Sequence, residues 1–173
     1  MIVKSDGYQI DFTNAINAFK FDETVVSEPT FHGVTALKAV DIIAEFDNEY
    51  VFVEIKEYRT EEFNESSGVD DKDCEFKHNR FEWLKTYLKY KFRDSLLYRY
   101  TENKVYKPIH YLCLLNFDNA LSLKMAKSLV SELPVGKKSP RWTNEISISC
   151  NVLNLDRWNE LFPKWPATGP ERR

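Results

Sequence analysis

Residues 38–58 read KAVDIIAEFDNEYVFVEIKEY, and this stretch predicts a β-hairpin with ionisable residues inside apolar strands. Two runs rich in Val, Ile and Phe flank Asp47 and Asn48, which both tolerate the positive φ angles of a two-residue hairpin loop. Counting outward from that loop places Asp41 directly opposite Glu54 on one face of the strand pair. A three-residue loop would put the two carboxylates on opposite faces unless a bulge restored the register.

Three ionisable side chains share one face of this predicted hairpin. Lys56 follows Glu54 by two residues, and side chains along a strand alternate with a period of two. Asp41 and Glu54 would repel each other across the strands, so a divalent cation between them is the chemical solution, and oxygen ligands suit Mg²⁺ or Mn²⁺. The ammonium of Lys56 could orient a water or neutralise charge on a phosphate. The alternative is a solvated sheet face on which charges alternate.

Asp41, followed after twelve residues by Glu54-Ile55-Lys56, resembles the active-site signature of the PD-(D/E)XK nuclease superfamily. The surrounding residues are most similar to its Holliday-junction-resolvase-like and small bacterial endonuclease-like branches. The resemblance implies a restriction-endonuclease-like α/β core, in which helices flank a mixed central sheet made of an antiparallel hairpin plus a parallel strand. It also implies that Asp41, Glu54 and the Ile55 carbonyl bind Mg²⁺ (or Mn²⁺), and that Asp41, Glu54 and Lys56 are the catalytic residues.

Two features depart from the superfamily pattern. Val40 stands where the proline of the family name would be, and the acidic residue often supplied by the first helix has no clear counterpart. Asp22, Glu23 and Glu28 are the candidates for that acidic residue, and Glu28 is the one included in the predicted site.

The function expected from this resemblance is Mg²⁺-dependent hydrolysis of phosphodiester bonds in DNA, with RNA as the second choice. The alternative is a non-catalytic module on the same fold that binds a protein or a nucleic acid. Divalent-metal binding separates the two, since a pure interaction module does not need the paired carboxylates. A homodimer is a further expectation, because many related nucleases cut both strands of a duplex as dimers.

Length and composition predict one domain over residues 1–173, since 173 residues with 43% hydrophobic content can bury a full core. No apolar run reaches the roughly 18 residues of a membrane span, and the N-terminus has no signal-peptide pattern. We therefore expect a cytoplasmic protein without a membrane partner. The three cysteines are odd in number and scattered, which favours reduced thiols over zinc ligands or disulfides.

The net charge is only −3, but its distribution is uneven. Residues 1–76 hold six Lys/Arg against 18 Asp/Glu, whereas residues 77–104 hold eight against three. Basic side chains predicted to contact nucleic acid are Lys77, Arg80, Lys85, Lys89 and Arg93. Charge balancing across a fold is the alternative explanation. Tyr87, Tyr90 and Tyr98 could stack on bases, or simply pack at the boundary of the core.

Hydrophobic periodicity and turn residues predict the remaining elements. We expect strands at 2–5 and 8–11, a short helix at 11–20, a strand or extended link at 22–31, a long helix at 77–102, a buried parallel strand at 108–117, a helix capped by Asp118, an outer strand at 146–153 and a helical turn or two at 156–162. Residues 59–76 predict a solvated acidic loop, and residues 163–173, which contain three prolines, predict a loosely held tail.

Overall fold

The computed structural model describes the backbone of residues 1–58, 71–136 and 139–170, and their side chains outside residues 71–79. Within these residues the elements follow one another as β1 (Ile2–Ser5), β2 (Tyr8–Asp11), β3 (Asn17–Lys20), β4 (Ile42–Glu45), β5 (Tyr50–Lys56), α1 (Asp71–Thr101), β6 (Ile109–Leu115), α2 (Asn119–Glu132), β7 (Ser147–Leu153), α3 (Leu155–Leu161) and β8 (Ala167–Thr168). The predicted α/β class is confirmed.

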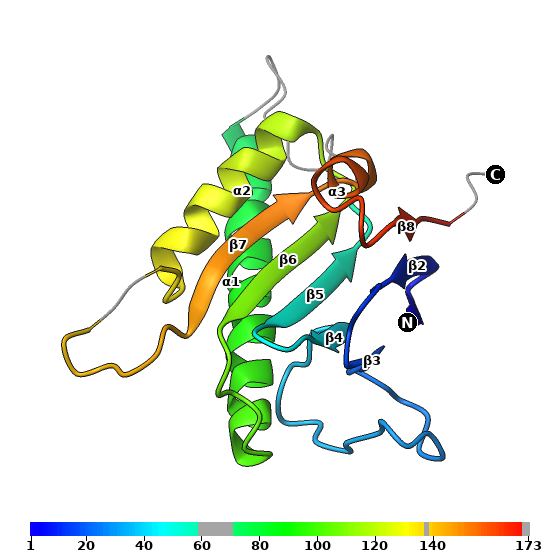
Figure 1. Ribbon diagram of the computed structural model, residues 1–173. Coiled ribbons are helices and arrows are strands. Elements are labelled where there is room, and N and C mark those ends of the chain that lie inside the picture. The colour runs from blue at the N-terminus through cyan, green and yellow to red at the C-terminus, as the bar shows by residue number, and fades with distance from the viewer. Residues whose placement is uncertain (59–70, 137–138, 171–173) are drawn as a thin grey trace.

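The central feature is a mixed five-stranded sheet with the order β3-β4-β5-β6-β7 (Figure 1). Strands β3, β4 and β5 run antiparallel, whereas β5, β6 and β7 run parallel. The hairpin register is the predicted one, because Glu45 pairs with Tyr50 and the amide of Phe46 donates to the Glu49 carbonyl at 2.9 Å. The buried strand after residue 107 is parallel to β5, and β7 is an edge strand, as expected.

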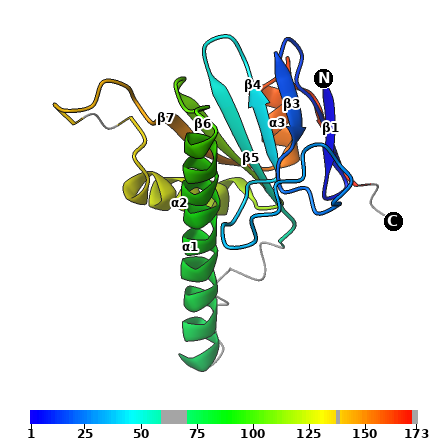
Figure 2. The same cartoon turned by 90° about the horizontal axis from the view of Figure 1, so that it is seen from below.

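Two layers cover the two faces of this sheet. Helices α1 and α2 pack on one face, whereas α3 and the small sheet β1-β2-β8 lie on the other (Figures 1 and 2). Successive residues of β4 and β5 therefore enter different cores, as Ile43 and Phe52 face α1 while Ile42 and Val53 face α3. By the same alternation, Asp41 and Glu54 point to the α1 side.

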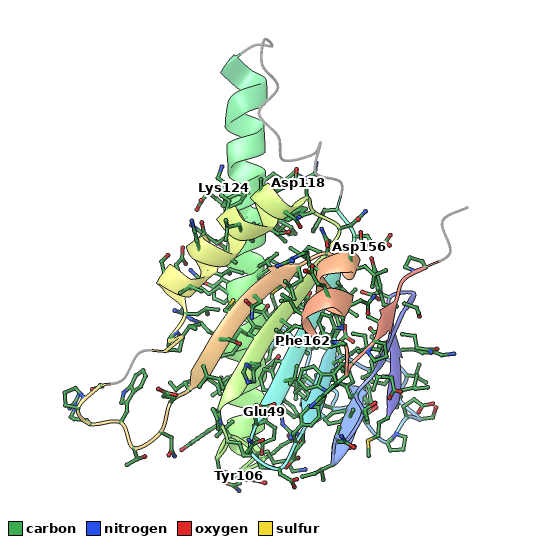
Figure 3. All side chains as sticks on the ribbon, turned by 45° about the horizontal axis from the view of Figure 1, so that its top comes forward. Glu49, Tyr106, Asp118, Lys124, Asp156 and Phe162 are labelled. Atoms are coloured by element: carbon green, nitrogen blue, oxygen red, sulfur yellow. The ribbon has the colours of Figure 1, made fainter. Side chains whose placement is uncertain are left out.

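The long helix is held by a buried stripe that includes Leu84, Leu88 and Phe92. A hydrogen bond of 2.9 Å from the Tyr111 hydroxyl to the Leu88 carbonyl also ties α1 to β6. Asp118 lies at the beginning of α2, where its carboxylate accepts the amide of Leu121 at 2.8 Å (Figure 3). Both helices match the periodicity of their sequences. No helix among the described residues combines the length and apolarity that a bilayer crossing requires.

Three sequence predictions were wrong. Residues 11–20 form no helix: Asn14 has a φ of 65°, and β3 pairs antiparallel with β4. The edge of β4 thereby gains backbone hydrogen bonds that a helix could not supply. The acidic loop predicted at 59–76 extends too far along the chain, because α1 begins at Asp71. Residues 59–70 of that prediction lie outside the described residues.

The third correction concerns the tail, of which residues 163–170 are attached to the body and residues 171–173 lie outside the described residues. Strand β8 pairs with β2, and the indole N–H of Trp158 donates to the Trp165 carbonyl at 2.7 Å. The Asn159 amide makes two hydrogen bonds to the backbone of Ala167, at 2.7 and 2.9 Å. These contacts hold the proline-rich segment in spite of its composition.

Candidate functional site

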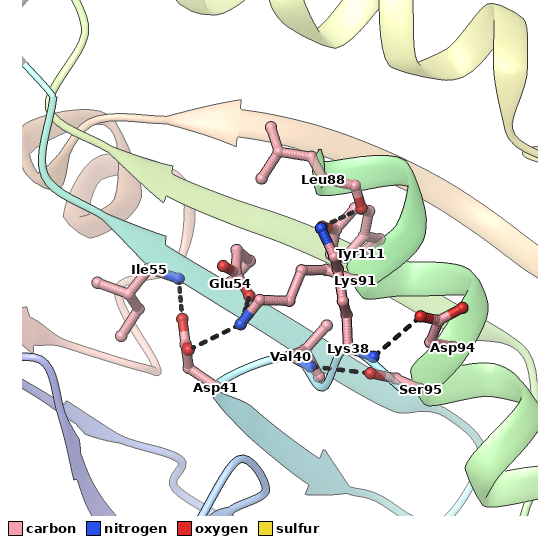
Figure 4. Close-up of polar contacts among 10 residues, drawn as sticks. All are labelled: Lys38, Val40, Asp41, Glu54, Ile55, Leu88, Lys91, Asp94, Ser95 and Tyr111. Carbon is pink, nitrogen blue, oxygen red and sulfur yellow. Dashed lines mark hydrogen bonds and ion pairs between the residues drawn. The ribbon is translucent and has the colours of Figure 1, made fainter. Parts of the chain in front are cut away.

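Asp41 and Glu54 converge in the interior between the sheet and α1 (Figure 4). Asp41 immediately precedes β4 and is 2% exposed, while Glu54 lies within β5 and is 0% exposed. The Asp41 carboxylate accepts the backbone amide of Ile55 through Oδ2, which fixes its orientation against the neighbouring strand. The carboxylate pair predicted from the hairpin register is therefore present, and it is buried.

Lys91 of α1 is the cation that contacts both members of this pair. Its Nζ lies 3.1 Å from Glu54 Oε2 and 3.5 Å from Asp41 Oδ1, and the residue is only 7% exposed (Figure 4). Helix α1 is positioned here by two contacts with the preceding chain: Val40 donates its amide to Ser95 Oγ at 2.8 Å, and Lys38 donates its amide to Asp94 Oδ2 at 2.9 Å. Lys91 falls within the helix predicted at 77–102, but it was not singled out from the sequence.

The electrostatics of the pair follow from its burial. Burial raises the pKa of Glu54 well above its ordinary value, the nearby Asp41 raises it further, and Lys91 opposes both effects. Burial lowers the pKa of Lys91, but the charges of Glu54 and Asp41 raise it more, so this ammonium stays protonated. Glu54 Oε1 is buried and finds no hydrogen-bond donor among the described residues. The site thus holds more acceptor capacity than the protein satisfies.

Asp22 is a third acidic side chain near the pair. Burial, followed by the proximity of Asp41, raises the pKa of Asp22 to about 7. The chain is anchored here by a 2.8 Å hydrogen bond from the Phe21 amide to the Asp41 carbonyl. Asp22 Oδ1 is buried and has no hydrogen-bond partner in the described part of the chain. Among the acidic candidates of this segment, Asp22 therefore lies nearest to the carboxylate pair.

The two other acidic candidates have different surroundings. Glu23 accepts the amides of Thr24 and Val25 at 2.8 and 2.9 Å, so it caps a local turn. Glu28 is exposed on the loop between β3 and β4, and its amide donates to the Val25 carbonyl at 3.0 Å. Among the described residues, Glu28 forms no hydrogen bond or ion pair with Asp41 or Glu54.

Lys56 ends β5 and is partly buried on the same face as Glu54. Burial lowers its pKa, but Tyr87 and Glu54 outweigh this effect and the net shift is upward. Its ammonium lies 5.6 Å from the centroid of the Tyr87 ring, which the Lys91 ammonium approaches at 5.5 Å. Tyr87 therefore lies beside both cations of the site.

A cavity of about 390 Å³ opens next to this cluster. Its wall includes Asp22, Lys38 and Lys91, and the rest is formed mainly by the loop that connects β3 to β4. Asp41 and Glu54 do not line this cavity; Lys91, which contacts both carboxylates, and Asp22 are the residues of the cluster that do.

The other basic residues predicted to bind nucleic acid have mixed surroundings. Lys85 and Lys89 both form ion pairs with Glu132 of α2, and Arg93 donates to the Glu132 carbonyl at 3.3 Å. These three side chains join α1 to α2, and the two lysine charges are already compensated. Arg80 lies on the partly buried surface of α1, and the side chain of Lys77 lies outside the described residues.

Within the described residues, no group of three or more His, Cys, Asp or Glu side chains is arranged to bind a metal ion. The carboxylates are nevertheless the oxygen ligands that Mg²⁺ prefers, and Mg²⁺ commonly takes only one or two from the protein. The unsatisfied oxygens of Glu54 and Asp22 fit a cation better than they fit an apolar core.

Comparisons of the chain with protein-family models, with curated proteins and with solved structures find no match. Functional inference therefore depends on the geometry and chemistry of this site.

Proposed function

We propose that this protein is a metal-dependent nuclease of the PD-(D/E)XK type, which hydrolyses phosphodiester bonds in DNA or, as the second choice, in RNA. The observation that carries the proposal is the convergence of Asp41 and Glu54 across a hairpin, with Lys56 on the same face. The order of elements supports it, because an antiparallel hairpin, a long helix and a parallel strand are the parts of a restriction-endonuclease-like core.

Asp41, Glu54 and the carbonyl of Ile55 would hold Mg²⁺ or Mn²⁺ in this proposal. A bound divalent cation supplies Lewis acidity and lowers the pKa of a coordinated water. The protein contributes the orientation of the ligands: the Ile55 amide fixes the Asp41 carboxylate, and β5 fixes Glu54 on the same face. Asp22, whose pKa is raised to about 7, is a group that could accept or return a proton near neutral pH.

The two lysines have separate roles in the proposal. Lys56 is partly buried at the end of β5, where its ammonium can donate to a non-bridging phosphate oxygen and stabilise developing negative charge. Lys91 is 7% exposed and contacts both carboxylates directly, so it is a positioning residue that opposes the effect of burial on the pKa of Glu54. Lys56 and Lys91 thus provide two positive charges near the carboxylates, which suits a substrate that carries one negative charge per phosphate.

The test is cleavage of labelled single-stranded, duplex and branched DNA, and of RNA, with Mg²⁺ or Mn²⁺. We expect Asp41→Asn and Lys56→Ala to lower the rate at least about 100-fold, as expected for groups that act on the transition state. Asp47→Asn is the matched control, because it removes an exposed carboxylate from the loop of the same hairpin. A folded wild-type protein that cuts none of these substrates, or that cuts equally well as Asp41→Asn, would refute the proposal.

A second candidate is a non-catalytic module that binds a protein or a nucleic acid on the same fold. The observation that favours it is the direct contact of Lys91 with both carboxylates, which places a positive charge between them without a metal. Calorimetric titration with Mg²⁺ and Mn²⁺ separates the two functions. Binding that is lost in Asp41→Asn supports the nuclease, and the absence of binding together with the absence of cleavage supports the module.

A further inference from the structure

Helix α1 exposes a row of aromatic rings beside the carboxylate pair. Trp83 is 53% exposed, and its ring stacks on that of Tyr87 with 5.3 Å between centroids and 18° between planes. Tyr90, almost two turns after Trp83, is 44% exposed. Spacings of four and three residues bring these rings to one side of a helix. We call Trp83, Tyr87 and Tyr90 the aromatic row.

Four lysines approach the aromatic row: Lys89 and Lys91, which pair with carboxylates, and Lys38 and Lys56. The ammonium of Lys38 lies 4.5 Å from the Tyr87 centroid and 6.0 Å from the Tyr90 centroid, and that of Lys56 lies 5.6 Å from Tyr87. Neither lysine forms an ion pair with a carboxylate in the part of the chain that the structure describes. Their charge is therefore available to an anionic ligand, in contrast to the charges of Lys85 and Lys89.

The aromatic row leads directly to the buried carboxylates. Tyr87 has Trp83 stacked on one side of it and lies 5.5 Å from the Lys91 ammonium. Lys91 in turn contacts Asp41 and Glu54. A ligand that lies along the exposed rings would thus lie close to Lys91, the residue that contacts both carboxylates.

We propose that this surface binds a single-stranded segment of nucleic acid, with unpaired bases stacked on Trp83 and Tyr90 and phosphates held by Lys38 and Lys56. The inference rests on the proposed function and names its substrate class as DNA or RNA with unpaired bases. Exposed rings offer flat faces to bases, and lysines between them match the phosphates of the same strand. The bases of a duplex are already stacked within it and cannot lie on these rings.

Two other tyrosines of α1 show that the row is distinct. Tyr98 is packed against Phe21 and His32 at centroid distances of 5.3 and 4.8 Å, so it belongs to the boundary of the core. Tyr100 is 66% exposed near the far end of the helix, and no cation–π contact with a lysine is found for it among the described residues. Tyr100 is therefore the matched control for an exposed ring on the same helix.

The test is fluorescence anisotropy with labelled oligothymidylate and with a duplex of the same length, in EDTA so that no cleavage occurs. We expect Trp83→Ala and Tyr90→Ala each to weaken binding of the single strand about 5- to 150-fold, the range for one stacked base. We expect Tyr100→Ala to leave it unchanged within about twofold. Lys38→Ala should reduce the slope of log K against log salt by about 0.7, the value for one phosphate of a single strand.

A second measurement is independent of the stability of the variants. Saturating oligothymidylate should quench the tryptophan emission of the wild type, and this quenching should be reduced in Trp83→Phe, which keeps an aromatic ring. The proposal is overturned if the wild type does not bind the single strand, or if Trp83→Ala and Tyr100→Ala behave alike. It is also overturned if the variants weaken single-strand and duplex binding equally.

The outcomes distinguish this inference from the proposed nuclease activity. Single-strand binding in EDTA without cleavage in Mg²⁺ would support the aromatic row and refute the nuclease. Duplex cleavage with no contribution from Trp83 and Tyr90 would support the nuclease and refute the aromatic row as its substrate surface.

Discussion

Replacement of Lys91 by Met is the perturbation that tests most directly how the carboxylate pair is held. Lys91 is 7% exposed, and its ammonium lies within 3.5 Å of both Glu54 and Asp41. Methionine keeps the length of the side chain but removes its charge. Removing one partner of a buried ion pair costs about 3–5 kcal/mol, because an uncompensated charge remains. We expect a loss of unfolding free energy of that size at pH 8.

The loss should depend on pH with a defined sign. Burial and Asp41 raise the folded-state pKa of Glu54 above its ordinary value of 4.5, and Lys91 opposes this rise. A carboxyl with a raised folded-state pKa binds its proton more tightly in the folded protein, so stability is highest at or below the unfolded pKa and falls as pH rises toward the folded pKa. Without Lys91 the folded-state pKa of Glu54 should rise further, so that this fall, at most about 1.4 kcal/mol per pH unit for one group, extends to higher pH.

The measurement is urea denaturation followed by circular dichroism at pH 5, 6, 7 and 8. Lys89→Met is the matched control, because Lys89 lies on the same helix and forms a surface ion pair with Glu132. It should cost less than about 1 kcal/mol. The reasoning is refuted if Lys91→Met loses the same free energy at every pH, since that result would assign the contribution of Lys91 to packing of its aliphatic stem.

Mg²⁺ adds a second readout to the same variant. If a divalent cation binds Asp41 and Glu54, saturation at about 100 times the dissociation constant should restore about 2.7 kcal/mol to Lys91→Met. Restoration should be absent in the double variant Lys91→Met/Asp41→Asn. A variant that is destabilised as described but does not respond to Mg²⁺ or Mn²⁺ would leave the ion-pair argument intact and refute metal binding at the pair.

Three further substitutions test the fold. Asn159→Ala should lose about 1–3 kcal/mol and speed proteolysis of residues 163–170, measured by mass spectrometry, because it removes both hydrogen bonds to Ala167; unchanged proteolysis would contradict the attachment of the tail. Phe92→Ala should cost about 3–5 kcal/mol by calorimetry, since Phe92 is fully buried against Phe52, and a loss under about 1 kcal/mol would contradict its burial. Glu132→Gln should cost about 1 kcal/mol at pH 7, the upper end of the range for exposed ion pairs, because these pairs are partly buried. Lys89 and Lys85 lower the Glu132 pKa to about 2, so the contribution of Glu132 to stability is present above the ordinary pKa of 4.5 and lost as pH falls toward 2. A difference in melting temperature between the wild type and Glu132→Gln that grows on acidification would contradict this.

The parts of the fold predicted correctly are those in which one local signal was sufficient. The loop of Asp47 and Asn48 set the register of the hairpin, because side chains alternate along a strand and a two-residue loop leaves one pairing. The nearly continuous apolar run of β6 predicted a strand covered on both faces, as the two hydrophobic cores require. Asp118 predicted the start of α2, since a carboxylate can accept the amide three residues later.

The failures arise where tertiary contacts outweigh a short local pattern. Residues 11–20 contain Phe12, Ile16 and Phe19 at helical spacing, yet Phe12 enters one core and Phe19 packs against the other. A ten-residue stretch of sequence cannot distinguish a helix from a turn followed by a strand, because both can place apolar residues at intervals of three or four. The available edge of β4 determined the outcome, and that edge is formed by residues more than twenty positions further along the chain.

Lys91 shows why the site was only partly predicted. Along α1 it lies three residues after Leu88 and one before Phe92, at the margin of the buried stripe, where a lysine usually extends its charge to water. Helical periodicity alone therefore does not distinguish an inward from an outward lysine. The distinguishing fact is the charge on the opposing surface, since Asp41 and Glu54 face α1 and their burial is costly without a cation. A hairpin with two opposed carboxylates thus implies a basic residue on the helix that covers it, and the candidates on α1 could have been ranked by their distance from the apolar stripe. Lys85 and Lys91 both lie about 60° from the centre of that stripe, on opposite sides of it. The ranking therefore excludes Lys89, and only the position of the two carboxylates selects Lys91 over Lys85.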